Sequence, residues 1–273
     1  MNTNLDRNEL LSKAEDIADK VLRSTKTFLP TLGRFCLVST FIEDGIRMWF
    51  QWNEQRDYMN LSWNCGYIIA TLFVVFNLFG QLIPSTFVLV RYKVPYACGL
   101  LFFIVILQTF AYDIIWDLHF LFRNFSLVGA LLLVYAESKE ENRSLFAGIP
   151  SIGDNRPKSY LQLSGRILVV FMFLTSISLE FNVFAVIEMI IKFGLMALVV
   201  IGYKTKLSAL VLVLWLTVLN FYFNCYWTIP SNKTMRDFLK YDFYQTLSII
   251  GGLLLVVCHG PGDVSLDEHK KRW

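Results

Sequence analysis

Long apolar segments, separated by short polar ones, make up most of the chain from residue 31 onward. Each is close to the roughly 20 residues that an α-helix needs to cross the hydrocarbon core of a bilayer. They lie at residues 31–50, 64–90, 94–116, 118–136, 163–179, 183–203, 206–228 and 241–259. The pattern therefore predicts an all-α, polytopic membrane protein with about eight transmembrane helices.

The first 30 residues follow a different pattern. Apolar side chains recur there at helical spacing among charged ones, at Leu10, Ala14, Ile17, Val21 and Phe28. This spacing predicts an amphipathic helix that ends at Pro30. Such a helix either lies in the membrane interface or packs against the protein's own loops.

The composition agrees with a membrane protein and excludes several other classes. Of the 273 residues, 55% are hydrophobic and 17% are charged, against about 25% charged in a soluble domain. This excludes a soluble enzyme, a disordered chain and a disulfide-rich secreted module. The net charge of +3 comes without a basic block, so we expect no nucleic-acid partner. The five cysteines lack CxxC spacing and no catalytic or metal-binding motif appears, so we expect no enzyme activity, metal or cofactor.

Lysine and arginine residues concentrate in alternate loops. With the N-terminus in the cytosol, the cytosolic side holds 16 of them. These 16 lie in residues 1–30, 91–93, 137–162, 204–206 and 270–272. The opposite side holds only Arg56, Lys233, Arg236 and Lys240. Because basic residues stay preferentially on the cytosolic side, this bias predicts an even number of spans and two cytosolic termini.

The two halves of the membrane region resemble each other at four points that occur in the same order. Gly33-Arg34 matches Gly165-Arg166, Phe79-Gly80 matches Phe193-Gly194, Gln108 matches Asn220, and LVGALLLV (127–134) matches IIGGLLLV (249–256). We therefore predict two parallel four-helix repeats, at residues 31–136 and 163–259, with a cytosolic linker at 137–162 and a cleft between the repeats. The four-helix unit also resembles the DoxX-like membrane fold.

Several ionisable residues of the predicted spans fall toward the lumenal ends. They are Glu43, Asp44, Arg47, Asp113, Asp117, Arg123 and Asp242. Charges inside a membrane are costly and face the protein interior or water. One interpretation is a closed ion-pair network, with Glu43 and Arg47 paired across one helical turn. A second is a lumenal cleft whose excess acids bind a cation such as a peptide α-amine, and a third is a proton-coupled transport path.

The last residues of the chain carry a candidate sorting signal. The predicted cytosolic tail, residues 260–273, ends Lys270-Lys271-Arg272-Trp273. Its lysines stand third and fourth from the C-terminus, as they do in the dilysine retrieval signal. We therefore expect the retrograde vesicle coat, COPI, to bind Lys270 and Lys271.

Several segments resemble the surfeit locus protein 4 family. They are residues 36–69, FAGIP at 146–150, GYKTKLSAL at 202–210, YWTIP at 226–230 and DFLKYDFYQT at 237–246. The resemblance implies a receptor that binds soluble secretory proteins, including lipoproteins, through signals near their N-termini in the endoplasmic reticulum lumen. It also implies export in COPII vesicles and a location in the endoplasmic reticulum membrane, with cycling through the ER-Golgi intermediate compartment and the Golgi.

Two other functions remain open from the residues alone. A membrane transporter or channel would use the same cleft between the repeats. A membrane oxidoreductase of the DoxX-like kind would need redox or metal ligands that the sequence does not offer.

Overall fold

The computed structural model describes residues 28–145, 183–201, 204–230 and 234–259, together with the single positions 13, 20, 24, 25, 163 and 167. These residues form eight α-helices and two short 3₁₀ helices. The first group comprises α2 (Leu29–Phe50), α3 (Trp52–Trp63), α4 (Gly66–Val90), α5 (Val94–Ala111), η1 (Ile114–Trp116) and α6 (Leu118–Leu145). The second comprises α8 (Val183–Ile201), α9 (Thr205–Phe223), η2 (Tyr226–Thr228) and α10 (Thr234–His259).

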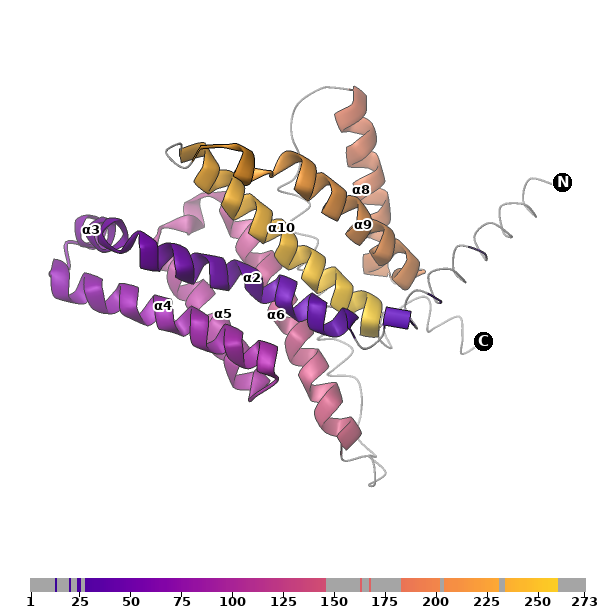
Figure 1. Cartoon of the computed structure of the whole chain (residues 1–273), viewed down its shortest axis with the longest axis horizontal. Helices are drawn as coiled ribbons and strands as arrows, with labels where there is room; N and C mark the ends of the chain where they lie inside the picture. Colours follow the sequence, from indigo (N-terminus) through magenta and orange to yellow (C-terminus); the bar gives the residue numbers. More distant parts are fainter. Residues whose placement is uncertain are drawn as a thin grey trace.

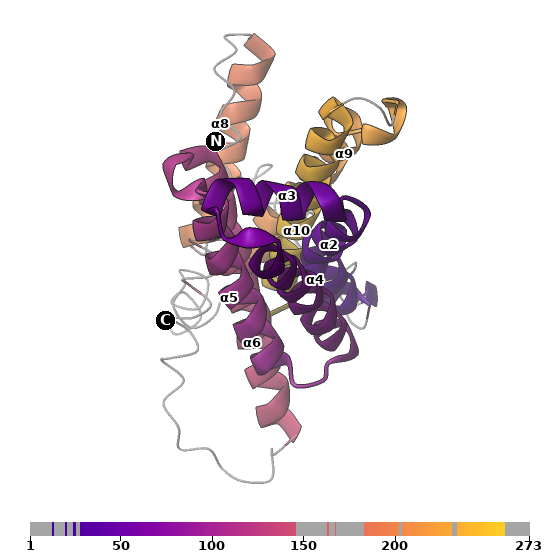
Figure 2. The same cartoon turned by 90° about the vertical axis from the view of Figure 1, so that its left-hand side faces the viewer.

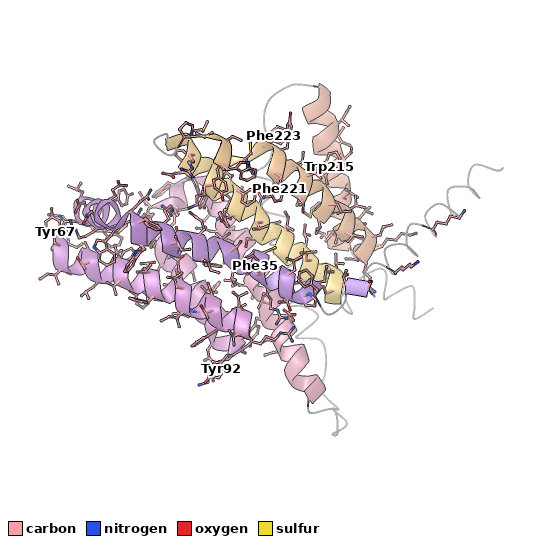
Figure 3. All side chains as sticks on the ribbon, viewed as in Figure 1. Phe35, Tyr67, Tyr92, Trp215, Phe221 and Phe223 are labelled. Carbon is pink, nitrogen blue, oxygen red and sulfur yellow. The ribbon has the colours of Figure 1, made fainter. Side chains whose placement is uncertain are left out.

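The helices form one bundle in which α2 is flanked by α4 and α10 (Figure 1). Within the part of the chain that the structure describes, five helices are long and apolar enough to cross a membrane, namely α4, α5, α6, α9 and α10. Aromatic side chains such as Phe35, Tyr92, Trp215 and Phe221 are exposed on the outside of the bundle (Figure 3). An apolar exterior of this extent is typical of a surface that faces lipid. The prediction of an all-α, polytopic membrane protein is confirmed.

The helices α2 and α10 cross in antiparallel directions at two glycines. A Cβ atom on Gly251 would lie 2.5 Å from the carbonyl oxygen of Gly33 and 2.6 Å from the amide nitrogen of Leu37. Farther along the crossing, Ser248 Oγ donates to the Leu37 carbonyl at 2.8 Å, and Thr40 Oγ1 donates to the Tyr244 carbonyl at 2.7 Å. Only glycine allows so close an approach of two helix backbones.

The pattern of apolar segments does not predict α3, which runs across one end of the bundle (Figure 2). This helix is too polar to resemble a membrane span, and its one fully buried side chain is Met59. Two aromatic contacts fix it to the end of α5. Trp63 Nε1 donates to the Ala111 carbonyl at 3.0 Å, and the ring of Tyr58 stacks on that of Tyr112 with centroids 5.7 Å apart.

Three predicted boundaries differ from the structure. The segment 94–116 is α-helical only to Ala111, because Asp113 has a left-handed backbone (φ 56°) and η1 follows it. The segment 118–136 continues as α6 to Leu145, so the predicted linker 137–162 begins as helix. Its first residues are polar but favour helix, and a search for apolar residues cannot detect such an extension. The segment 241–259 begins earlier, at Thr234.

Several predictions fall outside the described residues. These are the amphipathic helix at 1–30 and the span at 163–179, of which only single positions are described, the remainder of the linker and the tail 260–273. Two local features recur at matched positions of the predicted repeat. Lys93 before α5 and Lys204 before α9 both have φ 46°, and a 3₁₀ helix follows both α5 and α9. The arrangement of the repeats about an axis stays a prediction.

Candidate functional site

Six charged side chains from three helices form the candidate site, which we call the ionic layer. They are Glu43, Asp44 and Arg47 of α2, Arg123 of α6, and Lys240 and Asp242 of α10. The antiparallel crossing of α2 and α10 places the end of α2 beside the beginning of α10, and α6 packs against the same part of α10. All six side chains are buried or partly buried, where unpaired charge is costly.

Asp44 receives donors from three helices. Its Oδ1 pairs with Arg47, one turn along α2. Its Oδ2 accepts from Gln81 Nε2 of α4 at 2.8 Å and from Gln108 Nε2 of α5 at 3.0 Å. Sequence reasoning missed both glutamines as site residues, because a single neutral amide within an apolar segment carries no charge signal. Gln108 was noted only as a repeat match.

Glu43 pairs with Lys240 rather than with Arg47. Lys240 Nζ lies 3.1 Å from Glu43 Oε1, and the Glu43 side chain is only 4% exposed. The expected pair of Glu43 with Arg47 is therefore replaced by a pair between α2 and α10, while Arg47 contacts Asp44. Lys240 was counted as a loop residue in the sequence, and its helical start at Thr234 brings it to the layer.

Arg123 and Asp242 form the third ion pair and join α6 to α10. The Arg123 guanidinium also lies over the rings of Tyr241 and Phe120, 5.7 and 5.9 Å from their centroids. Tyr241 in turn accepts a hydrogen bond from Gln245 Nε2 at 2.9 Å through its hydroxyl oxygen. The pair is therefore held by aromatic contacts as well as by charge.

The structure does not bring Asp113 and Asp117 into these pairs. Both side chains are exposed on the connection between α5 and α6. Asp117 Oδ1 accepts from the backbone amide of Phe120 at 3.4 Å, in the position of an N-terminal cap of α6. The layer itself holds three acids and three bases, so the excess of acids that the sequence suggested lies outside it.

An aromatic cluster borders the layer on the side of α9 and α10. It comprises Phe221, Tyr226, Trp227, Phe243 and Tyr244, with ring centroids 5.3 to 6.4 Å apart. Trp227 is half exposed, whereas Phe243 is buried. The cluster offers an apolar wall next to the charged layer.

A second buried ion pair lies near the other end of α2. Arg34 Nη2 is 3.8 Å from Glu137 Oε1 of α6, and both side chains are almost fully buried. Sequence reasoning missed this pair, since both residues fall where a predicted span meets its flanking segment and charges are common there. Among the described residues, no three His, Cys, Asp or Glu side chains are grouped so that they could hold a metal ion.

Residues 8–273 of the chain match the SURF4 family. The chain is 61% identical over 266 residues to a Surfeit locus protein 4 homolog of Drosophila melanogaster, which covers 97% of this chain and 98% of the relative. A Surfeit locus protein 4 homolog of Schizosaccharomyces pombe is 41% identical over 252 residues, or 89% of this chain and 82% of the relative. The ER-derived vesicles protein ERV29 of Saccharomyces cerevisiae is 39% identical over 263 residues, which are 95% of this chain and 83% of the relative.

No solved structure gives a significant match. The sequence comparisons nevertheless cover almost the whole chain and agree with one another. They confirm the resemblance noted from the sequence: this multi-pass membrane protein belongs to the SURF4 family.

Proposed function

We propose that this chain is a cargo receptor of the early secretory pathway. It binds soluble secretory proteins, lipoproteins among them, in the endoplasmic reticulum lumen and carries them toward the Golgi in COPII vesicles. It then returns by means of the COPI coat, which binds Lys270 and Lys271. On this proposal the chain has no enzyme activity and cycles between the endoplasmic reticulum, the intermediate compartment and the Golgi.

Membership of the SURF4 family is the observation that carries this proposal. The relative from Saccharomyces cerevisiae is named for ER-derived vesicles, and it aligns with 95% of this chain. The basic residues of the sequence support the orientation, because their bias places both termini, and so the C-terminal lysines, in the cytosol. In that orientation the ionic layer lies at the lumenal end of α2.

We assign the ionic layer, with Asp113 and Asp117 exposed beside it, to cargo binding. Its charges balance, so an incoming α-ammonium must replace a cation that is already present. Glu43 would lose its one ion-pair partner among the described residues if Lys240 left. Asp44 would keep the amides of Gln81 and Gln108 if Arg47 left. The exchange costs less at Asp44, so we place the α-ammonium of the cargo there, in place of Arg47.

Crosslinking in intact microsomes tests the proposal. A photo-reactive group on the lumenal connection between α5 and α6 should capture soluble secretory proteins, and the same group on the cytosolic side should not. Cargo with an acetylated N-terminus should be captured less well than cargo with a free one. Equal capture of blocked and free N-termini would contradict the exchange at Asp44.

Purified protein in liposomes tests the alternative function. A receptor should move no small solute across the liposome membrane, whereas a transporter or channel should. Transport of a solute that stops when Asp44 is replaced by Asn would favour the alternative.

A further inference from the structure

Three polar side chains lie on one buried face of α4, a helix made mostly of apolar residues. Asn77, Gln81 and Ser85 follow one another at intervals of one helical turn, and each is 0% exposed. Asn77 Nδ2 donates to the Phe73 carbonyl at 2.9 Å, and Gln81 Nε2 donates to Asp44. The amide nitrogens of Asn77 and Gln81 thus already donate hydrogen bonds, whereas their amide oxygens can only accept them.

The oxygens of these three side chains have no hydrogen-bond partner. We call Asn77 Oδ1, Gln81 Oε1 and Ser85 Oγ the acceptor row. A buried oxygen without a donor is destabilising, and a leucine at the same position would avoid the cost. Three such oxygens in line indicate that hydrogen-bond donors reach the row in a working state of the protein.

A helix-weakening residue lies within the row. Pro84 stands between Gln81 and Ser85 in the interior of α4. Proline has no N–H, so the helix supplies no donor to the carbonyl of Gly80, four residues earlier. Helices bend most readily at such positions. The helix α4 can therefore move away from α2 and α5 where the row needs to be uncovered.

The spacing of the row matches an extended peptide. Side chains four residues apart on a helix are displaced by about 6 Å along its axis. The backbone N–H groups that point to one side of an extended chain recur every second residue, about 6.6 Å apart. Gln81, the middle residue of the row, donates to the carboxylate of Asp44. A peptide that enters from the lumenal end of α4 and holds its α-ammonium at Asp44 would align its following N–H groups with Gln81 and then with Asn77, one turn nearer the start of α4.

We propose that Gln81 and Asn77 of the acceptor row bind the backbone N–H groups of the extended N-terminal segment of the cargo. This inference rests on the proposed function and on the placement of the cargo α-ammonium at Asp44. Recognition through the backbone accepts many side chains, so one receptor could bind cargo of different sequence.

Peptide binding to the purified full-length protein tests the inference. The probe is a fluorescent ten-residue peptide with a free α-amine and an extended apolar sequence, together with copies N-methylated at single residues. Asn77→Leu should weaken binding about tenfold, as expected for one lost hydrogen bond in a water-free site, whereas Ser85→Ala, on the other side of Gln81, should leave binding unchanged. Both variants should melt at the temperature of the wild type or above it, because each removes an unbonded buried oxygen.

Thr86→Ala is the matched control, because the Thr86 hydroxyl is on the exposed side of α4 and donates to the Leu82 carbonyl. It should leave peptide binding unchanged. N-methylation should weaken binding to the wild type at alternate residues only, and in Asn77→Leu it should no longer do so at the residue that faces Asn77.

Two outcomes overturn the inference separately from the proposed function. If the wild type binds the peptide and Asn77→Leu binds it equally well, the row does not contact cargo. If Asn77→Leu and Ser85→Ala lower the melting temperature without affecting binding, the row holds structural water only. Failure of the wild type to bind any free-amine peptide would instead contradict the proposed function itself.

Discussion

Two neighbouring acids on α2 should respond to different extents when their cations are removed. Lys240→Met leaves Glu43 charged, 4% exposed and without its ion-pair partner, since Lys240 Nζ is 3.1 Å away in the wild type. Breaking a buried pair in this way costs about 3–5 kcal/mol. The Lys240 side chain is itself 29% exposed. We therefore expect the free energy of unfolding to fall by about 3 kcal/mol, the lower end of this range.

Arg47→Met should lower the free energy of unfolding by less than Lys240→Met does. Asp44 keeps two amide donors, from Gln81 at 2.8 Å and Gln108 at 3.0 Å, and we expect a loss of about 1 kcal/mol. It should also bind a free-amine peptide more tightly, because the cargo ammonium no longer competes with the guanidinium. In Lys240→Met the guanidinium of Arg47 still occupies Asp44, so the peptide affinity of the folded fraction should rise less than in Arg47→Met.

Thermal unfolding in detergent and fluorescence anisotropy of the peptide measure the two effects on the same samples. The control for Lys240→Met is the double variant Glu43→Gln with Lys240→Met, which removes the stranded charge and should regain most of the lost stability. If Arg47→Met binds the peptide more weakly than the wild type, the exchange at Asp44 is wrong. If Lys240→Met is fully stable, Glu43 does not depend on the pair.

Three further predictions concern the fold, the orientation and the sorting signal. Gly251→Ala should lower the melting temperature. Overpacking at the helix crossing should destabilise the fold by about 1–3 kcal/mol, which outweighs the stabilisation of about 1 kcal/mol from the higher helix propensity of alanine. Its control Gly99→Ala, which has nothing within 4 Å of the added Cβ, should be neutral or stabilising. Tags at both termini should be removed by protease from sealed microsomes, and protection of either would contradict the eight-span orientation. Replacing Lys270 and Lys271 by Ser should shift the protein from the endoplasmic reticulum to the Golgi, as imaging at normal expression would detect.

The sequence predicted the membrane helices well, because a span is defined mainly by its run of apolar residues. The segments 64–90 and 206–228 correspond within a few residues to the candidate spans Gly66–Val90 and Thr205–Thr228. It did not predict α3, since this helix has no apolar run and depends on aromatic contacts to α5 that only the fold creates. Helix formation by tertiary contact leaves little trace in local composition.

The candidate site was predicted only in part. The acids of α2 stood out because charge is rare in an apolar segment, and the structure places Glu43 and Asp44 in the ionic layer. Their partners could not be assigned, because Lys240 comes from the far end of the chain and Gln81 is neutral. Spacing along one helix suggested a pair of Glu43 with Arg47, but a cation from another helix lies closer.

The charges of α2 explain how a helix too polar to count among the five apolar spans can lie within the bundle. Arg34 pairs with Glu137 of α6, and Glu43 pairs with Lys240 of α10. Both partners are synthesised after α2, and α10 is the last described helix. The cost of burying Glu43 is therefore offset only when α10 has packed against α2. Closure of the α2–α10 crossing at Gly33 and Gly251 also brings Lys240 and Asp242 of α10 into the ionic layer.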